Sequence, residues 1–221
     1  KLRSLNCSGN GLTGLDLSNN SSIQSLDCYD NQLTTLDLSN NPELKLIWCF
    51  DNQLTSLNIS HNPQILELFC DKNQLSSLVV SNNPALIHLY CNVNQLTSID
   101  LSSCTELIRL YCDENLLTSL DVSNNSLLER FHCGANQLTS LDVSGNTGLT
   151  YLDCRENQIT SLYVGDNPAL DTLDCSNNQL SVLNVSKNIA LLYLDCGWNH
   201  DLELLDVSNC TALRYLSCYY D

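Results

Sequence analysis

Cysteine recurs at a fixed interval along this chain. Every twenty-first position from Cys7 to Cys196 is a cysteine, and an eleventh follows with one position more: Cys7, Cys28, Cys49, Cys70, Cys91, Cys112, Cys133, Cys154, Cys175, Cys196 and Cys218. A period of about 20 to 50 residues that is kept along a whole chain is typical of a solenoid, in which one small unit stacks on copies of itself. The interval therefore predicts a single repeat domain over residues 1–221.

These cysteines are expected to be free thiols. The chain has 13 cysteines and no Cys-x-x-Cys pair. Equivalent atoms on adjacent turns stand about 4.8 Å apart with parallel side chains, whereas the Cβ atoms of a disulfide prefer about 3.8 Å. A buried thiol packs as a small apolar group, so we expect reduced cysteines in the core. A ladder of metal ligands is the alternative that this spacing disfavours.

The composition excludes several functions. The chain carries 25 acidic and nine basic residues, a net charge of −16, which repels nucleic acid and anionic membrane. No apolar run approaches the roughly 18 residues of a membrane span. The four histidines lack paired ligand spacing, so neither a metal nor a cofactor is predicted, and no catalytic constellation stands out. Methionine is absent and both ends fall inside a repeat, which indicates a fragment of a longer protein.

The repeat unit can be written from residues 23–43, IQSLDCYDNQLTTLDLSNNPE. Its pattern, L-x-x-L-x-C-x-x-N-x-L-x-x-L-x-L-x-x-N-x-x, resembles the leucine-rich repeat signature, and about ten copies and a partial one cover the chain. The 21-residue length, the cysteine column and the phrase LTSLDVS resemble the bacterial internalin J type. The resemblance implies a right-handed solenoid, often displayed on a bacterial surface, with binding on the concave sheet.

Local patterning predicts the strands. The column Leu26, Ile47 and Leu68 alternates with polar neighbours at a period of two, which is typical of a short strand with one buried face. The second half of each unit alternates in the same way, so a second strand or extended segment is expected on the opposite side. Leucine-rich repeats are conventionally classed as α/β, but this chain is expected to be mostly β with almost no helix. His200 and Asp201 stand where other units have a single residue, which predicts a small bulge.

Two asparagine columns are predicted to face inward. The first is unbroken from Asn10 to Asn199, and the second, which begins at Asn20, has cysteine at Cys104 and Cys210. An amide offers both a donor and an acceptor, so it can pair the backbone groups that a turn leaves open. The two replacing thiols are weak donors and are expected to be inert turn residues.

Sequence variation is concentrated in the first half of each unit. Twelve of the 14 aromatic residues occupy outward positions of that half, and eight of the nine basic residues fall in it or just before it. The column before cysteine reads Asn6, Asp27, Trp48, Phe69, Tyr90, Tyr111, His132, Asp153, Asp174, Asp195 and Ser217. Its aromatic part predicts a stripe about 19 Å long, at about 4.8 Å per turn. Neighbouring columns add Phe50, His88, Arg109, Arg130, Tyr151 and Arg155.

The stripe is interpreted as a recognition surface, because exposed aromatic residues and arginine dominate interface hot spots. The alternative is cross-strand stacking that only stiffens the sheet. The candidate binding residues are Trp48, Phe50, Phe69, His88, Tyr90, Arg109, Tyr111, Arg130, His132 and Tyr151. Replacing Trp48 and Tyr90 with alanine is expected to abolish binding with little change in melting temperature.

The acidic columns are interpreted as solvated faces. One is Asp153, Asp174 and Asp195, for which calcium or a basic partner is the alternative. The other lies in the second half of the unit: Asp16, Asp37, Asp100, Asp121, Asp142 and Asp206.

The sequence thus predicts a non-catalytic binding module of a bacterial surface or secreted protein, whose partner is a protein or glycoprotein. Two alternatives remain open: a glycan surface in which sugar rings lie on the aromatic faces, and a structural stalk without a ligand. Open end strands also leave weak self-association through the solenoid ends as an expectation. Neither nucleic acid nor membrane insertion is expected.

Overall fold

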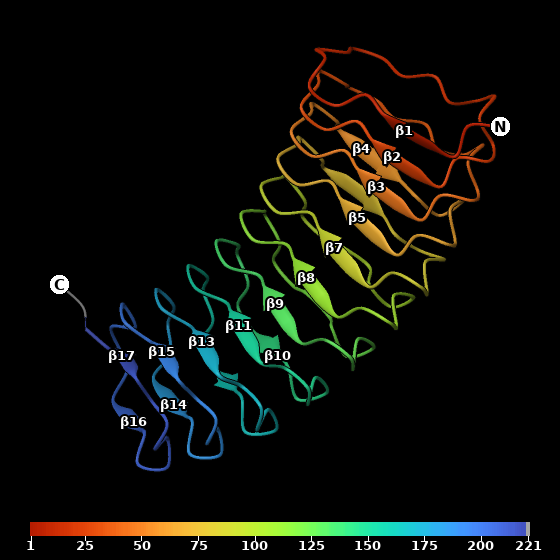
Figure 1. Ribbon diagram of the computed structural model, residues 1–221. Helices are drawn as coiled ribbons and strands as arrows, with labels where there is room; N and C mark the ends of the chain where they lie inside the picture. Colours follow the sequence, from red (N-terminus) through yellow and green to blue (C-terminus); the bar gives the residue numbers. More distant parts are fainter. Residues whose placement is uncertain (220–221) are drawn as a thin grey trace.

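The computed structural model describes residues 1–219 and shows an elongated solenoid with its termini at opposite ends (Figure 1). One side is a parallel sheet of eleven strands, which pair in sequence order. These strands are β1 Ser4–Asn6, β2 Ser25–Asp27, β3 Leu46–Trp48, β5 Glu67–Phe69, β7 His88–Tyr90, β8 Arg109–Tyr111, β9 Arg130–His132, β11 Tyr151–Asp153, β13 Thr172–Asp174, β15 Tyr193–Asp195 and β17 Tyr215–Ser217.

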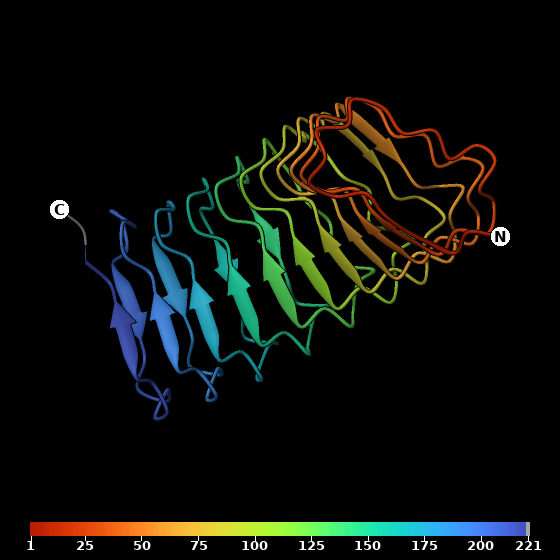
Figure 2. The ribbon, with the colours of Figure 1, turned by 45° about the horizontal axis from the view of Figure 1, so that its top comes forward.

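The opposite side is less regular. It holds three two-stranded parallel sheets, made of β4 Ser56–Asn58 with β6 Ser77–Val79, β10 Leu141–Asp142 with β12 Leu162–Tyr163, and β14 Val182–Asn184 with β16 Leu204–Asp206. The second strand is therefore present in six turns of residues 1–219. Residues 1–219 contain no helix, so the expected parallel-strand solenoid of mostly β structure is confirmed. Figure 2 shows how its turns are progressively rotated along the stack.

The core is a set of repeated columns. Leu26, Ile47 and Leu68 are fully buried, and so are the cysteines from Cys28 to Cys175. All 13 cysteines are free. Burial raises the pKa of the ladder thiols from Cys7 to Cys196, in Cys28 to about 12. They therefore stay protonated at neutral pH and pack as small apolar groups.

Asparagine amides pair the backbone of neighbouring turns, as the sequence predicts. Asn136 donates from Nδ2 to the carbonyl oxygens of Cys112 and Cys133 at 3.0 and 3.1 Å, and its Oδ1 accepts the Leu117 N–H at 2.9 Å. In the second column the thiol of Cys104 donates to the Val80 carbonyl at 3.7 Å. Asn83 makes the same contact one turn earlier, from Nδ2 to the carbonyl of Ile59 at 3.2 Å.

The exposed aspartates of the second half close turns. The Oδ1 atom of Asp142 accepts the backbone N–H of Ser144 at 2.9 Å, and this hydrogen bond lowers the pKa of Asp142. The same contact recurs in other turns, for example between Asp121 and Ser123. The expected solvated face is confirmed for this column, and it also fixes local backbone geometry.

One residue per turn adopts the left-handed conformation. It is the second residue after the ladder cysteine, and its φ lies between 50° and 57° in nine successive turns from Asp30 to Trp198. Most of these residues are charged or polar, but Val93 has a φ of 53°. A β-branched residue is strained there, because its branched Cβ crowds the backbone.

The extra position at His200 and Asp201 changes register without ending the solenoid. Partners in the eleven-stranded sheet are one repeat length apart up to Tyr193, which pairs with Thr172. Tyr193 then pairs with Tyr215, which lies one position beyond the repeat length. The predicted bulge is therefore absorbed in one connection.

Candidate functional site

The outward side chains of the eleven-stranded sheet form the candidate site, which we call the strand face. It comprises the first and third residues of each strand and the residue directly after each ladder cysteine. In strands such as β7 the middle residue is buried and the two flanking residues are half-buried. Parallel, in-register pairing places equivalent residues of successive turns beside one another, so each sequence column becomes a row on this face.

A continuous stack of rings occupies the middle of the strand face. Phe69, Tyr90 and Tyr111 lie face to face, with centroids 4.4 and 4.3 Å apart and planes within 12°. His132 continues the stack 4.1 Å from Tyr111, and Tyr151 follows 4.4 Å from His132. Because neighbouring ring faces cover one another, the stack presents mainly ring edges to solvent.

Trp48 ends this stack differently. Its indole lies at 86° to Phe69, with centroids 5.9 Å apart. Neither indole face is therefore stacked on Phe69, although the ring is half-buried. Its Nε1 atom is buried and has no hydrogen-bond partner in the described part of the chain. Phe50 lies in the row after the cysteines and stacks on Tyr29, with centroids 4.5 Å apart.

The two flanks of the stack carry opposite charge. On one side His88, Arg109 and Arg130 are aligned in register, and the Arg130 guanidinium lies over the Tyr151 ring at 5.7 Å. On the other side, in the row after the cysteines, are Asp71 and Asp113. Burial raises the pKa of both carboxyls. A partner that lies across the stack therefore meets a basic flank and an acidic flank.

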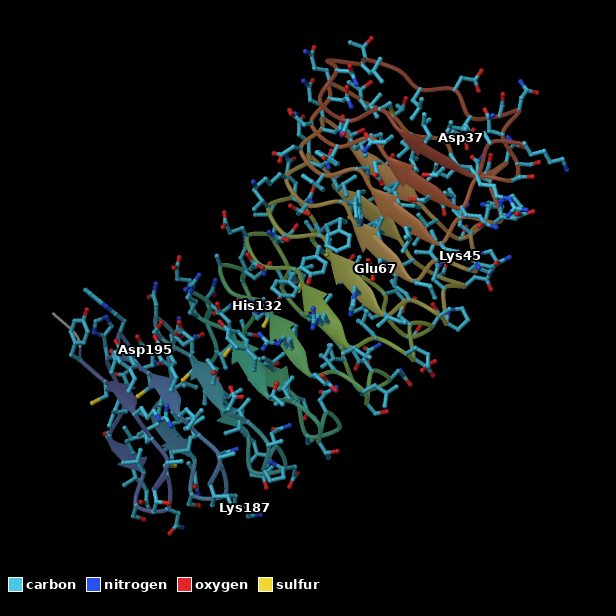
Figure 3. The ribbon with its side chains drawn as sticks, viewed as in Figure 1. Asp37, Lys45, Glu67, His132, Lys187 and Asp195 are labelled. Carbon is cyan, nitrogen blue, oxygen red and sulfur yellow. The ribbon has the colours of Figure 1, made fainter. Side chains whose placement is uncertain are left out.

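An ion-pair network follows the stack toward the C-terminus. Arg155 joins two aspartates of adjacent strands: its Nε lies 3.6 Å from Asp153 Oδ2 and its Nη1 lies 3.8 Å from Asp174 Oδ2. His132 Nδ1 also approaches Asp153 Oδ2 at 3.9 Å. Figure 3 shows His132 over β9 and Asp195 nearer the C-terminal end of the same face.

Burial controls protonation in this network. It raises the pKa of Asp153 to about 6, although Arg155 opposes the shift. Burial also lowers the pKa of His132 to about 4, assisted by the cations Arg130 and Arg155. In both groups desolvation of the charged form outweighs the attraction between this histidine and carboxylate.

One sequence interpretation is wrong. The pattern places Asp153 and Asp174 on a solvated face, but they are 4% and 9% exposed. Their carboxylates lie against the sheet because Arg155 and nearby backbone and hydroxyl donors hold them there. Asp174 Oδ1 accepts the Ser176 hydroxyl at 2.6 Å, and Asp153 Oδ1 accepts the Arg155 N–H at 3.2 Å.

All ten predicted site residues lie on the strand face. Six form one row of contacting rings, from Trp48 to Tyr151, and Arg130 contacts its last ring. His88 pairs with Glu67 at 3.3 Å. Sequence reasoning missed the network in which the exposed Arg155 pairs with two buried aspartates, although the run of aspartates before the cysteines, beside a lone arginine, was visible. Tyr220, one of the twelve aromatic residues at outward positions of the first half, lies outside the described residues.

The described part of the chain lacks two other kinds of site. Within residues 1–219, no three histidine, cysteine or acidic side chains gather as metal ligands. No helix long and apolar enough to cross a membrane occurs in the same part of the chain.

The repeat sequence and the solenoid define this chain as a leucine-rich repeat protein. It is similar to the functional domain of internalin J from Listeria monocytogenes, which includes a cysteine ladder, with 34% identity and a TM-score of 0.95. The match covers 98% of this chain and 53% of that one, so the chain spans about half of the internalin structure.

Other solved structures share the fold. A leucine-rich repeat protein from Leptospira interrogans is 23% identical with a TM-score of 0.86, over 99% of this chain and 67% of that one. YopM, a leucine-rich effector from Yersinia pestis, is 25% identical with a TM-score of 0.71, over 98% and 71% of the two chains. No protein-family model and no curated protein matches the sequence.

Proposed function

We propose that the chain is the recognition module of a bacterial surface or secreted protein, and that its strand face binds a protein or glycoprotein partner. The observation that carries this proposal is the unbroken ring stack between flanks of opposite charge. Tyrosine, tryptophan and arginine are enriched where binding energy is concentrated. A scaffold needs only repetition, and these residues interrupt the repetition on one face.

The stack supports protein recognition over the glycan alternative. Sugar recognition by aromatic residues uses an open ring face, but Tyr90 and Tyr111 have their faces covered by neighbours at 4.1 to 4.4 Å. Ring edges and exposed guanidinium groups suit the mixed apolar and polar surface of a polypeptide. The stalk alternative predicts that no strand-face substitution alters binding.

Arginine substitutions give a sharper test than the loss of stacked rings. Tyr90 contacts a ring on each side, so its removal also weakens the fold. Arg109 and Arg130 are exposed, and their replacement by glutamate reverses one flank. Lys187 is the single basic residue in the second half of a unit and lies away from His132 in Figure 3. Lys187→Glu is therefore the matched control.

The test measures binding of this protein to an array of purified host and bacterial ectodomains. We expect at least one ectodomain to bind, with about tenfold or greater loss in Arg109→Glu/Arg130→Glu and no change in Lys187→Glu. Equal loss in the control, or binding that is insensitive to the double variant, contradicts the assignment to this face. Antibody labelling of intact source cells tests the surface location separately.

A further inference from the structure

A separate cavity of about 600 Å³ lies at the C-terminal end of the strand face. Asp174, Asp195 and Ser217, the last residues of β13, β15 and β17, line it together with Arg155 and Tyr219. The side chains of Tyr193 and Trp198 also line it. Among residues 1–219, its charged groups are three carboxylates, the third being Glu156, and one guanidinium. The cavity therefore combines net negative charge with aromatic walls.

Small residues leave this cavity open. The position directly after the ladder cysteine is Arg155 in one turn, then Ser176 and Gly197 in the next two. A Cβ on Gly197 would lie 2.8 Å from the Tyr219 carbonyl oxygen and 3.2 Å from Asp195 Oδ1. Glycine at this position therefore permits the close approach of the next turn and adds no side chain to the cavity.

Arg155 shows which chemical group these carboxylates accommodate. Its guanidinium bridges Asp153 and Asp174 on adjacent strands, at 3.6 and 3.8 Å. The row of aspartates continues to Asp195, but Ser176 and Gly197 supply no cation there. Within residues 1–219, no basic group lies within 4.0 Å of the Asp195 carboxylate. Asp195 thus occupies the same position as Asp153 and Asp174 in the repeat, but it has no counterpart of the Arg155 guanidinium beside it in the described part of the chain.

One further lining residue lacks a partner. Ser217 is 7% exposed, and its hydroxyl has no hydrogen-bond partner among residues 1–219. That hydroxyl lies 3.5 Å from the site where a Cβ of Gly197 would stand. Asp195 Oδ1 accepts the Gly197 N–H at 3.0 Å, which holds the carboxylate in place. A buried hydroxyl without a partner beside a fixed carboxylate is an incomplete polar site.

The walls favour an organic cation over a bare ion. Tyr193 stacks on Tyr215 with centroids 4.5 Å apart, and the Trp198 ring lies 6.4 Å from Tyr219. Aromatic rings attract ammonium and guanidinium groups. Burial together with the charges of Asp174 and Asp195 raises the pKa of Tyr193 to about 12, consistent with negative potential in the cavity.

We propose that this cavity binds an organic cation, a guanidinium or primary ammonium group, against Asp195 and between the aromatic walls. The group comes from an arginine or lysine side chain of a polypeptide or from a free amine. An isolated cation binds there whether or not the ring stack contacts a protein, so the two proposals fail separately.

Trp198 provides the signal for the test. The chain has two tryptophans, so a Trp48→Phe background leaves Trp198 as the only indole. The probes are the blocked tripeptide Gly-Arg-Gly, its citrulline counterpart, which lacks the charge, and spermidine. We expect the arginine peptide or spermidine to change Trp198 fluorescence with a Kd below about 1 mM, and the citrulline peptide to have no effect. Tighter binding of the peptide assigns a polypeptide source, and tighter binding of spermidine assigns a free amine.

Three variants make the result decisive. Asp195→Asn keeps the Oδ1 acceptor for Gly197 and is expected to weaken binding about tenfold or more, because charge-assisted hydrogen bonds are lost. Ser176→Arg adds a built-in guanidinium and is expected to block binding. Asp206→Asn makes the same charge change on the exposed opposite side and should have no effect. Absence of binding by both cations, equal binding of citrulline, or full affinity in Asp195→Asn overturns the proposal.

Discussion

The left-handed position at Val93 is a measurable weak point of the scaffold. Its φ is 53°, while equivalent turns carry Asp30, Glu114 or Asn177 with nearly the same angle. The conformation is fixed from both sides: the Val93 N–H donates to the Asp113 carbonyl at 3.0 Å, and the Val93 carbonyl accepts from Asn73 at 3.3 Å. The chain cannot relax without giving up these bonds, so the strain persists in the folded state.

Val93→Asn should therefore stabilise the protein. Left-handed backbone costs an ordinary L-residue about 1 to 2 kcal/mol, and asparagine tolerates it better because its short polar side chain can hydrogen-bond locally. Val93 is half-buried, so the loss of apolar contact offsets part of the gain. We expect a net gain of about 1 kcal/mol in the free energy of unfolding, or about 2 to 4 °C in melting temperature for a domain of this size.

The reverse change tests the same reasoning. Asn177 has a φ of 52° and is exposed, so Asn177→Val should destabilise by a similar amount. Val79→Asn makes the same substitution at a half-buried strand residue, which pairs with Asn58, and should give no gain. Urea unfolding followed by circular dichroism measures all three. A neutral or destabilising Val93→Asn, together with a neutral Asn177→Val, refutes strain as the explanation.

Further predictions concern protonation, stacking and thiols. Burial raises the pKa of Asp153 from 3.8 to about 6. The contribution of Asp153 to the free energy of unfolding is therefore fully present below about pH 3.8, and about 3 kcal/mol of it is lost as the pH rises from there through 6. The pKa of His132 is lowered from 6.5 to about 4, so the contribution of His132 to the free energy of unfolding is fully present above about pH 6.5 and is lost as the pH falls through 4. The two slopes oppose each other, so Asp153→Asn should make the free energy of unfolding rise more steeply between about pH 4 and 6 than it does in the native protein; an unchanged slope in urea unfolding contradicts the assignment. Tyr111→Ala removes two stacked contacts and should cost about 2 kcal/mol in chemical unfolding, whereas Arg109→Ala should cost less than about 0.5 kcal/mol; equal costs contradict a stabilising stack. Ellman's reagent should react first with the exposed Cys218, and with buried thiols only on unfolding; rapid reaction of many thiols in the native protein contradicts the buried ladder.

The scaffold was predictable because every turn repeats the same pattern of apolar and polar residues. The repeat period places Leu26 beside Ile47, and parallel pairing of the strands then follows. The asparagine columns were equally readable, since a polar residue at a fixed inward position needs a backbone partner in each turn. Because the unit is repeated, positions that stay the same in every turn can be told apart from positions that vary, which a single strand does not allow.

Side-chain placement on the strand face was less predictable. Residues in one column share a row, but their rotamers depend on neighbours that differ from turn to turn. Tyr151 joins the stack through His132, which belongs to a different column. Asp153 is held inward because Arg155 stands two positions later. On the opposite side, the second strand forms in six turns of residues 1–219. The same phrase, TSLDVS, is a strand at Leu141–Asp142 but not at residues 120–121, so the local sequence alone does not decide where these strands form.

Within residues 1–219, the strands contact only their immediate neighbours along the stack, and this has a consequence for inheritance. A duplication or deletion of one whole repeat unit by unequal recombination leaves every remaining interface of the same kind as before. A substitution on the outward face of one turn likewise leaves the buried columns unchanged. Such a gene can alter what its product contacts, one short segment at a time, while the product keeps folding throughout.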